Sequence, residues 1–299
     1  MLTPLEAPDS VYQEAWQQSI EKMKNHYENF PVASVFLPTA LQLPIETIYV
    51  FARCADDFAD EYPDSPHYSL RQLQLFRNQL RAIELNRPVE PHLFGRVQHI
   101  ITHYHLPLHC FHALLDAFVQ DVRKKSYATT SEVMLYCSKS ANPIGQLLLH
   151  LTGNATPDNI AYSDAICTAL QQINFYQDLR QDYLENGRIY IPQEELDAYG
   201  VDKEHFKSAK RDYRIRLLMI KQTRATYVLL RSGIPLGDRL TGRFGLEIRL
   251  IINSGLQVLN MLHQHRKNPF FRPRLRFYHW PRIMMNALLH RYPTIAGLN

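Results

Sequence analysis

The sequence predicts an all-α fold in one domain that spans residues 1–299. Apolar residues recur with a period close to 3.6 along most of the chain, which is the pattern of amphipathic helices. Only 11 glycines occur in 299 residues, too few for a fold of many strands joined by tight turns. No linker rich in Gly, Ser or Pro divides the chain, and its length is within reach of a single core of about 250–300 residues.

The expected helices end where proline or glycine interrupts the apolar pattern. Such breaks fall near Pro63, Pro91, Pro107, Gly153 and Gly187. We expect helices at residues 10–28, 44–61, 68–84, 93–104, 107–124, 130–138, 143–152, 157–185, 203–231, 238–264 and 281–290.

Composition excludes several classes of protein. Hydrophobic residues make up 45% and charged residues 21%, as in a globular protein rather than a disordered one. The four cysteines form no CxxC pair, so neither a zinc site nor a disulfide framework is indicated. The N-terminus does not read as a signal peptide, and no run of about 18 apolar residues predicts a membrane span. We therefore expect a cytoplasmic protein.

Charge is distributed unevenly along the chain. Residues 207–299 hold 18 Lys and Arg against three acidic residues, a net charge of +15. The first 206 residues carry a net charge of −11. Two interpretations stay open: a surface that pairs with itself, or an acidic half that collects cations and a basic half that meets phosphates or an anionic membrane. No recognition motif for nucleic acid accompanies the charge.

The segment PIETIYVFARCADDFADEYP predicts a helix with one acidic face. At 100° per residue, the side chains of Tyr49, Arg53, Asp56 and Asp60 fall within about 60° of one another. Apolar residues such as Phe51 occupy the opposite arc. The helix therefore packs on one side and presents two carboxylates, one turn apart, on the other.

A second acidic face is predicted for TPDNIAYSDAICTALQQINFYQDLRQDYLENGRIYIP. Thr156 is the expected N-cap of one continuous helix that ends near Gly187. The stripe on this helix is about 80° wide. It consists of Gln171, Asn174, Asp178 and Asp182.

Both stripes suit a divalent cation. Like charges four residues apart on a helix repel, and only Arg53 offsets them here. Mg²⁺ takes oxygen ligands and is commonly held by one or two carboxylates together with substrate phosphates. A solvated acidic face is the plain alternative for either stripe alone. Two such stripes in one helical chain favour a clamp for a metal and a diphosphate.

These segments resemble the squalene/phytoene synthase family of isoprenoid synthases. FARCADDFADE is similar to the first aspartate-rich motif of that family, and QQINFYQDLRQD followed by GRIYIP is similar to the second. LLDAFVQDVRKKSYAT and LYCSKSANPIGQLLL resemble its central helices. The resemblance runs from about Phe30 to Pro192 and implies a helical bundle with a central cavity.

The resemblance also implies roles for individual residues. The expected magnesium ligands match the two acidic motifs: Asp56, Asp60, Asn174, Asp178 and Asp182. Contacts to the diphosphate or the prenyl chain are implied for Tyr49, Arg53, Gln171, Phe30 and Arg188. Tyr136 matches a tyrosine near the reacting carbocation, and Asp116, Asp121 and Tyr127 match the central acidic segment.

The chain departs from the family pattern at several positions. Tyr27 and Asn29 stand where serines are common, and Gln177 stands where an arginine usually precedes the second-motif aspartate. Gly255 replaces an aromatic residue of some members. These departures leave fewer groups to hold two diphosphates, as a condensation would require.

ENFPVAS, SANPIG and INFYQD are similar to one bacterial branch, whose members convert presqualene diphosphate and water into hydroxysqualene. The resemblance therefore implies magnesium-assisted loss of diphosphate, rearrangement of the cation and capture by water. Aromatic candidates to line the cavity include Phe30, Tyr49, Phe51, Phe118 and Tyr136.

Alternatives remain open from the sequence. Within the family, the chain could condense two prenyl diphosphates as a presqualene diphosphate, squalene or phytoene synthase. Outside it, an all-helical nucleotide pyrophosphatase or a binding protein without activity would share the fold class. Expected partners are the isoprenoid substrate, enzymes for the preceding and following steps (a presqualene diphosphate synthase and a hydroxysqualene reductase), and peripheral contact with a membrane at its inner face through FFRPRLRFYHWPR.

Overall fold

A computed structural model describes residues 39–62 and 64–298. The expected helix at 10–28 and the candidate Phe30 lie outside these residues. Within them the chain is helical, and one isolated bridge between Ser126 and Ile189 is the sole β-pairing described. The all-α prediction is confirmed. The chain divides into two compact units, joined between Arg123 and Lys124; the expectation of a single domain stays a prediction.

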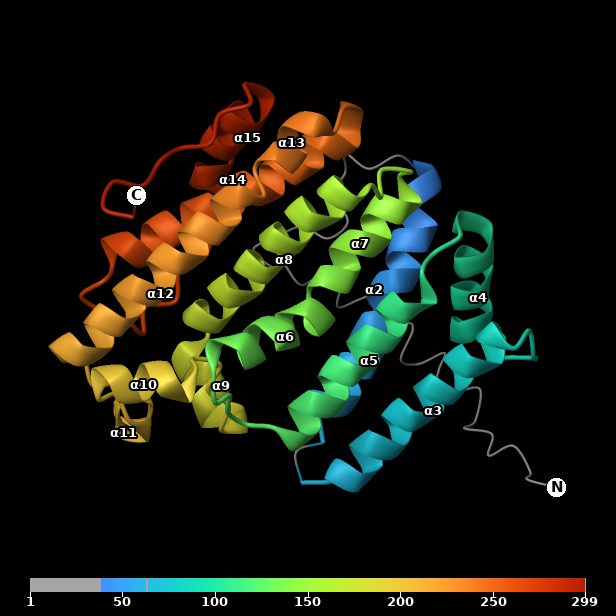
Figure 1. Ribbon diagram of the computed structural model, residues 1–299, viewed down its shortest axis with the longest axis horizontal. Coiled ribbons are helices and arrows are strands. Elements are labelled where there is room, and N and C mark those ends of the chain that lie inside the picture. The colour runs from blue at the N-terminus through green and yellow to red at the C-terminus, as the bar shows by residue number, and fades with distance from the viewer. Residues whose placement is uncertain (1–38, 63, 299) are drawn as a thin grey trace. The chain divides into compact units, whose positions relative to one another are not determined.

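The described part of the first unit consists of four helices (Figure 1). They are α2 (Thr39–Asp60), α3 (Pro66–Glu84), α4 (Leu93–Tyr104) and α5 (Leu108–Arg123). Their common core is aromatic: the ring of Phe51 on α2 lies 5.6 Å from Phe76, 6.2 Å from Phe94 and 5.2 Å from Phe111. Phe51 is fully buried there, so it holds the unit together and does not line a cavity, contrary to its place among the cavity candidates.

The second unit is larger and is built around one long helix. Its elements are α6 (Thr130–Ser140), α7 (Asn142–Leu151), α8 (Pro157–Gln177), α9 (Leu179–Asn186), α10 (Gln193–Tyr199), α11 (Lys203–Lys207), α12 (Tyr213–Ser232), α13 (Pro235–Arg239), α14 (Gly242–Gln264), the 3₁₀ helix η1 (Phe277–His279) and α15 (Trp280–Leu288). Helix α8 packs against α6, α7, α12 and α14 (Figure 1). A helix enclosed on this many sides needs apolar residues around most of its circumference.

Capping residues explain where several helices begin. The Thr156 hydroxyl accepts a hydrogen bond from the Asn159 N–H at 3.3 Å, which confirms it as the N-cap of α8. Asp212 caps α12 through the N–H groups of Arg214 and Ile215, at 3.0 and 3.4 Å. The expected helix at 203–231 is therefore interrupted, because a cap at Asp212 starts a new helix after α11.

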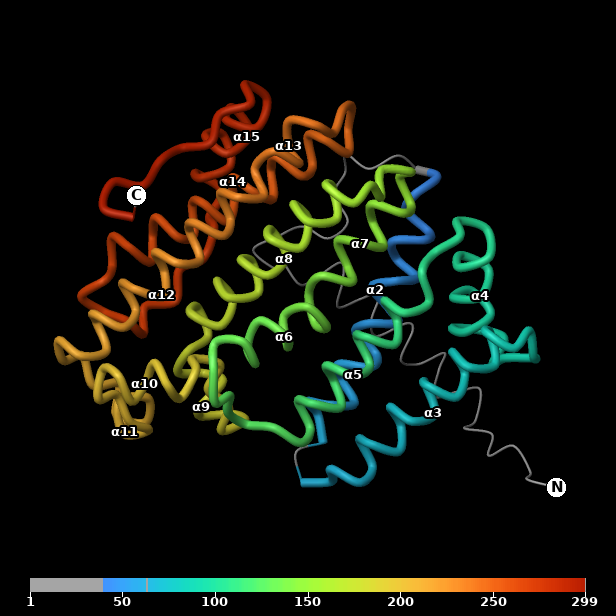
Figure 2. Tube along the Cα trace, in the orientation of Figure 1, coloured from blue at the N-terminus to red at the C-terminus, as the bar shows by residue number. Residues whose placement is uncertain are grey.

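The expected continuous helix at 157–185 is also wrong in one place. Helix α8 ends at Gln177, and α9 begins at Leu179. Asp178 lies between them with φ −101° and ψ 12°, outside helical geometry, and Figure 2 follows the chain from α8 into α9. One continuous helix would place Leu184 opposite the acidic stripe, on the packed side, but Leu184 is 53% exposed. The periodicity continues through the junction, so the pattern alone does not reveal the break.

Candidate active site

Helix α2 presents its acidic face as the sequence predicts. Its apolar arc is buried, with Ile48 at 3% and Ala55 at 0% exposure, which turns Arg53 and Asp56 to the other side. Arg53 Nη2 lies 2.8 Å from Asp57 Oδ1, and Nη1 lies 3.3 Å from Asp56 Oδ2. Arg53 thus pairs with the carboxylates of its own helix, where it offsets part of their charge.

Arg53 does not fully offset the effect of burial and neighbouring charge on Asp56. Burial, and then repulsion from Asp60, raise the pKa of Asp56 to about 7, although Arg53 pulls in the opposite direction. Asp121 on α5 and Asp57 add to the repulsion. A carboxyl group whose ionisation is opposed by burial and by neighbouring carboxylates is a place where a cation would bind.

Helix α5 divides its two acidic residues between different tasks. Asp121 is 4% exposed and belongs to the group of carboxylates around Asp56. Asp116 instead forms an ion pair with Arg77 of α3, with Nη2 and Oδ1 2.6 Å apart. Helical spacing could not separate these roles, because they depend on what packs against each face of α5.

In the second unit the candidates lie around the junction of α8 and α9. Gln171 and Asn174 are half-buried on the last turns of α8, and Asp182 is half-buried in the first turn of α9. Asp178 occupies the junction itself, where its backbone N–H donates to Asn174 O at 2.9 Å. Its carbonyl in turn accepts from the Asp182 N–H at 2.8 Å. The backbone therefore links three members of the predicted stripe.

The C-terminal segment meets this junction through two neighbouring residues. The carboxylate of Asp178 forms an ion pair with the Arg272 guanidinium. The Gln177 amide is buried and donates to Pro273 O at 2.6 Å. Gln177, where the family pattern has arginine, thus fixes the backbone beside the arginine that reaches Asp178. Sequence reasoning missed Arg272, because 94 residues separate it from Asp178.

Tyr136 lies in a cluster of aromatic rings, which we call the aromatic cluster: Tyr127, Tyr136, Phe175 and Tyr190. The rings of Phe175 and Tyr190 stack with centroids 3.9 Å apart. Tyr136 lies 5.5 Å from Tyr127 and 5.6 Å from Tyr190. Sequence reasoning singled out Tyr136 but missed Phe175 and Tyr190 as its neighbours.

Pairing between two non-helical segments assembles this cluster. Ile189 N–H donates to Lys125 O at 2.9 Å, and Gln193 N–H donates to Tyr127 O at 2.8 Å. These bonds join the GRIYIP segment and the first residue of α10 to the residues before α6. Arg188, the substrate-binding candidate in GRIYIP, is 7% exposed, and its N–H donates to Asp182 O at 3.1 Å. The acidic junction and the aromatic cluster are therefore neighbours along this segment.

In each unit the carboxylates are suited to a divalent cation that also has ligands outside the protein. In the part of the chain that the structure describes, no three His, Cys, Asp or Glu side chains gather closely enough to hold a metal by themselves. Two features still favour a cation: the raised pKa of Asp56, and a guanidinium already placed on Asp178. Carboxylates in ones and twos are how Mg²⁺ is held when substrate phosphates and water complete its shell.

The order of these motifs matches a known family. The family model described as "Squalene/phytoene synthase" matches residues 23–281. The chain belongs to the squalene/phytoene synthase family. Its members are isoprenoid synthases, so the resemblance seen in the acidic motifs and the assignment to an enzyme of this family are confirmed.

Individual relatives extend over most of the chain. "Hydroxysqualene synthase" of Zymomonas mobilis is 38% identical over 244 residues, 80% of this chain and 80% of its own. "Hydroxysqualene synthase" of Sinorhizobium fredii is 31% identical over 236 residues, 79% of each chain. A solved structure, "squalene synthase HpnC from Alicyclobacillus acidocaldarius", is 27% identical with a TM-score of 0.76, and covers 87% of this chain and 97% of its own.

Proposed function

We propose that this member of the squalene/phytoene synthase family is a hydroxysqualene synthase, which converts presqualene diphosphate and water into hydroxysqualene and diphosphate. The main support is the 38% identity to the Zymomonas mobilis enzyme of that name, shared over 80% of both chains. The buried aromatic cluster and the carboxylates around Asp56 are features that such a reaction needs.

The proposed site combines the two acidic faces. Mg²⁺, together with the substrate diphosphate, would be held by Asp56, Asp60, Asn174, Asp178 and Asp182. When bound, the metal would supply a Lewis acid that neutralises charge on the leaving diphosphate. We assign contacts with the diphosphate and the prenyl chain to Arg53, Arg188, Tyr49, Gln171 and Phe30. That the two acidic faces meet around one substrate belongs to this proposal.

The chemistry then needs little acid–base help. The C–O bond to diphosphate breaks and the electron pair leaves with the diphosphate, so that a cyclopropylcarbinyl cation remains. The ring of Tyr136, backed by its three aromatic neighbours, would stabilise this cation by about 0.5–2 kcal/mol per ring face. After rearrangement, the oxygen of a water molecule bonds to the cation and gives up its proton. Excluding water until that step is the task of the buried apolar surroundings.

The alternative within the family is condensation of two prenyl diphosphates, as in a presqualene diphosphate, squalene or phytoene synthase. Its support is the solved neighbour whose title calls it a squalene synthase. Gln177 disfavours it, because a neutral amide tied to Pro273 O adds no positive charge for a second diphosphate.

Product analysis separates the two activities. The protein is incubated with Mg²⁺ and presqualene diphosphate in one reaction, and with Mg²⁺ and farnesyl diphosphate in another. We expect hydroxysqualene from the first and no condensation product from the second. Presqualene diphosphate formed from farnesyl diphosphate would contradict the proposal and support the alternative.

The proposed reaction also indicates where the enzyme acts and which enzymes act before and after it. We propose a cytoplasmic enzyme in peripheral contact with the inner face of a membrane, since both its substrate and its product carry long apolar chains. A presqualene diphosphate synthase would supply the substrate, and a hydroxysqualene reductase would consume the product. Among the described residues, no helix is both long enough and apolar enough to cross a bilayer.

A further inference from the structure

The last two helical elements expose apolar side chains on one side. Phe277 is 85% exposed and Tyr278 58%, while on α15 Met285 is 56% exposed and Leu288 54%. Leu289, at the end of α15, is also exposed. We call these five residues the apolar stripe. Exposed apolar residues are ordinary when scattered, but a run of them on one element indicates a surface that meets a partner.

Helical geometry shows that the stripe is a second apolar face of α15. Ile283 and Ala287 are buried and pack the helix against α14. At 100° per residue, Met285 and Leu288 lie about 100–160° away from those two residues. Ile283, Ala287, Trp280 and Met284 pack on the core, whereas Met285 and Leu288 stay exposed.

Cations border the stripe, and the nearby carboxylate of Asp238 contacts His290 and Tyr292 rather than any of these arginines. Arg274, Arg276, Arg282 and Arg291 are all exposed, and the sequence holds no Asp or Glu after Glu247. None of these four arginines forms an ion pair with a described residue. Their charge is therefore directed to the solvent side and is available to an external anion.

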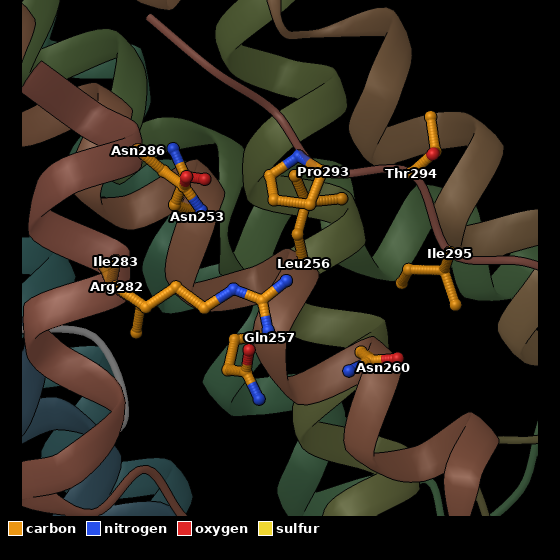
Figure 3. A pocket seen from close by; sticks show the side chains of 10 residues that line it. All are labelled: Asn253, Leu256, Gln257, Asn260, Arg282, Ile283, Asn286, Pro293, Thr294 and Ile295. Carbon is orange, nitrogen blue, oxygen red and sulfur yellow. The ribbon is translucent and has the colours of Figure 1, made fainter. Parts of the chain in front are cut away.

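A small pocket lies between α14, α15 and the C-terminal residues (Figure 3). Arg282 extends across it, and Asn286 and Thr294 also line it. Asn253 in its wall is 3% exposed, and its Oδ1 has no hydrogen-bond partner. The volume is about 70 Å³, room for about five water molecules. An isoprenoid chain cannot fit, whereas part of a polar anionic headgroup that also carries hydroxyl donors can.

From these observations we infer that η1 and α15 form a membrane-docking surface, with the apolar stripe inserted among lipid chains and Arg282 on an anionic headgroup at the pocket. Aromatic and aliphatic residues on one face beside arginines are the composition of helices that lie in a bilayer interface. Anionic lipids attract such basic segments, and the attraction weakens as salt screens it.

A second copy of the chain fits this surface less well. A two-fold interface places the same patch of both copies face to face. Arg276, Arg282 and Arg291, none of which has a carboxylate paired with it among the described residues, would then approach their own counterparts, which costs free energy. An anionic bilayer offers both features at once, an apolar layer and a negative surface.

Vesicle binding tests the inference. The full chain is sedimented with vesicles of phosphatidylcholine, and separately with vesicles of phosphatidylcholine mixed with phosphatidylglycerol. We expect binding to the mixed vesicles alone, reduced by added salt. Equal binding to both vesicle types, or binding to neither, would overturn the inference.

Variants locate the surface. The double variant Phe277→Ser/Leu288→Ser should bind the mixed vesicles at least about tenfold more weakly, because it removes two large apolar side chains from the stripe. Its matched control is Leu217→Ser/Val228→Ser, which changes two residues of α12 that are 51% and 58% exposed and should bind as the unmodified protein does. Circular dichroism and thermal unfolding verify that both variants fold.

The role of the cation is tested in the same way. Arg282→Gln should weaken binding about fivefold, the effect of one charge at the membrane surface. Arg224→Gln, an exposed arginine of α12, is the control and should have no effect. Unchanged vesicle binding by the stripe variant Phe277→Ser/Leu288→Ser would overturn the inference. The inference would also be overturned if this variant lost a dimer, measured by sedimentation velocity, and kept its vesicle binding. No substrate enters these assays, so their outcome is independent of the proposed function.

Discussion

Asp178 has one role through its backbone and another through its side chain. Its backbone ends α8 and starts the turn into α9, while its carboxylate points to Arg272. The backbone role does not need the side chain, because the bonds that join Asn174, Asp178 and Asp182 use N–H and C=O groups. Removing the carboxylate therefore tests its role in the reaction and leaves these backbone hydrogen bonds in place.

We expect Asp178→Ala to lower turnover of presqualene diphosphate by at least about a hundredfold, because it removes a group that would hold the metal against the leaving diphosphate. The free energy of unfolding should change by less than about 1 kcal/mol. Asp158→Ala, near the start of α8, is the control, since Asp158 is 66% exposed and pairs with Arg239. Normal turnover by Asp178→Ala would show that the metal assignment is wrong.

Arg272 competes with any metal for Asp178. We expect Arg272→Gln to tighten the binding of divalent cations by about two- to fivefold, the value of one partly exposed ion pair. Titration with Mn²⁺ in the absence of substrate, followed by electron paramagnetic resonance, measures this. Arg274→Gln, which removes an exposed arginine without an ion pair, should leave the affinity unchanged. Weaker binding in the Arg272 variant would mean that this arginine supports the metal site instead.

At the scale of elements, the capping residue Asp212 fixes where α12 begins in the basic half of the chain. Asp212 accepts two backbone N–H groups at the start of α12 and lies 3.2 Å from the buried ring of His205, between their Oδ2 and Nε2 atoms. Burial alone would raise the pKa of Asp212, but the bonds from His205 and Ile215, with Arg214 nearby, lower it to about 2. The ionised carboxylate is thus the form that the folded state prefers.

Asp212→Ala should destabilise the protein by about 1–2 kcal/mol near neutral pH, the usual cost of losing an N-cap. Because the pKa is lower in the folded state, this contribution is present above the ordinary pKa of 3.8 and is lost as the pH falls toward about 2. Urea unfolding near neutral pH and at about pH 3 measures the difference. Thr241→Ala is the control, since Thr241 precedes α14 without a side-chain capping bond. An equal effect of Asp212→Ala at both pH values would contradict the electrostatic explanation.

Close packing of α7 on α8 explains the glycine in SANPIG. A Cβ atom on Gly145 would lie 2.3 Å from Ser163 Oγ and 2.7 Å from Cys167 Sγ. Gly145→Ala should therefore lower the free energy of unfolding by about 1–3 kcal/mol, as overpacking does. Gly95→Ala in α4 is the control, because its Cβ would meet just one atom, at 3.7 Å. Gly95→Ala should stabilise the protein by about 0.5–1 kcal/mol, because alanine has less conformational freedom to lose on folding than glycine. Thermal and urea unfolding compare the two, and a neutral Gly145→Ala would show that α7 can move away from α8.

At the scale of the whole molecule, the proposal requires that both units respond to the same ligand. The carboxylates of α2 belong to the first unit, and those of α8 and α9 belong to the second. Mg²⁺ with inorganic diphosphate should therefore slow amide hydrogen exchange in α2 and α9 together. Asp178→Ala should remove the protection from both, whereas Asp158→Ala should keep it. Protection confined to α9 would mean that the second unit binds the ligand alone.

The amino-acid sequence by itself determined the helical class, most helix positions and the two acidic faces. These features depend on residues three or four apart, and such spacing is visible in the sequence. It also indicated Thr156 as the N-cap of α8. Resemblance to the squalene/phytoene synthase family indicated Tyr136 as a residue near the reacting carbocation. The break at Asp178 escaped it, because the periodicity continues through the junction.

Only the tertiary structure decided which distant residues complete the candidate site. It brought Arg272 to Asp178, placed Phe175 and Tyr190 beside Tyr136, and separated Asp121 from Asp116 by what packs against each. It also showed that α15 packs through one apolar face and exposes another. The physical reason is that these contacts join segments far apart in the chain, or depend on which face a neighbouring helix covers. Local periodicity carries no information on either.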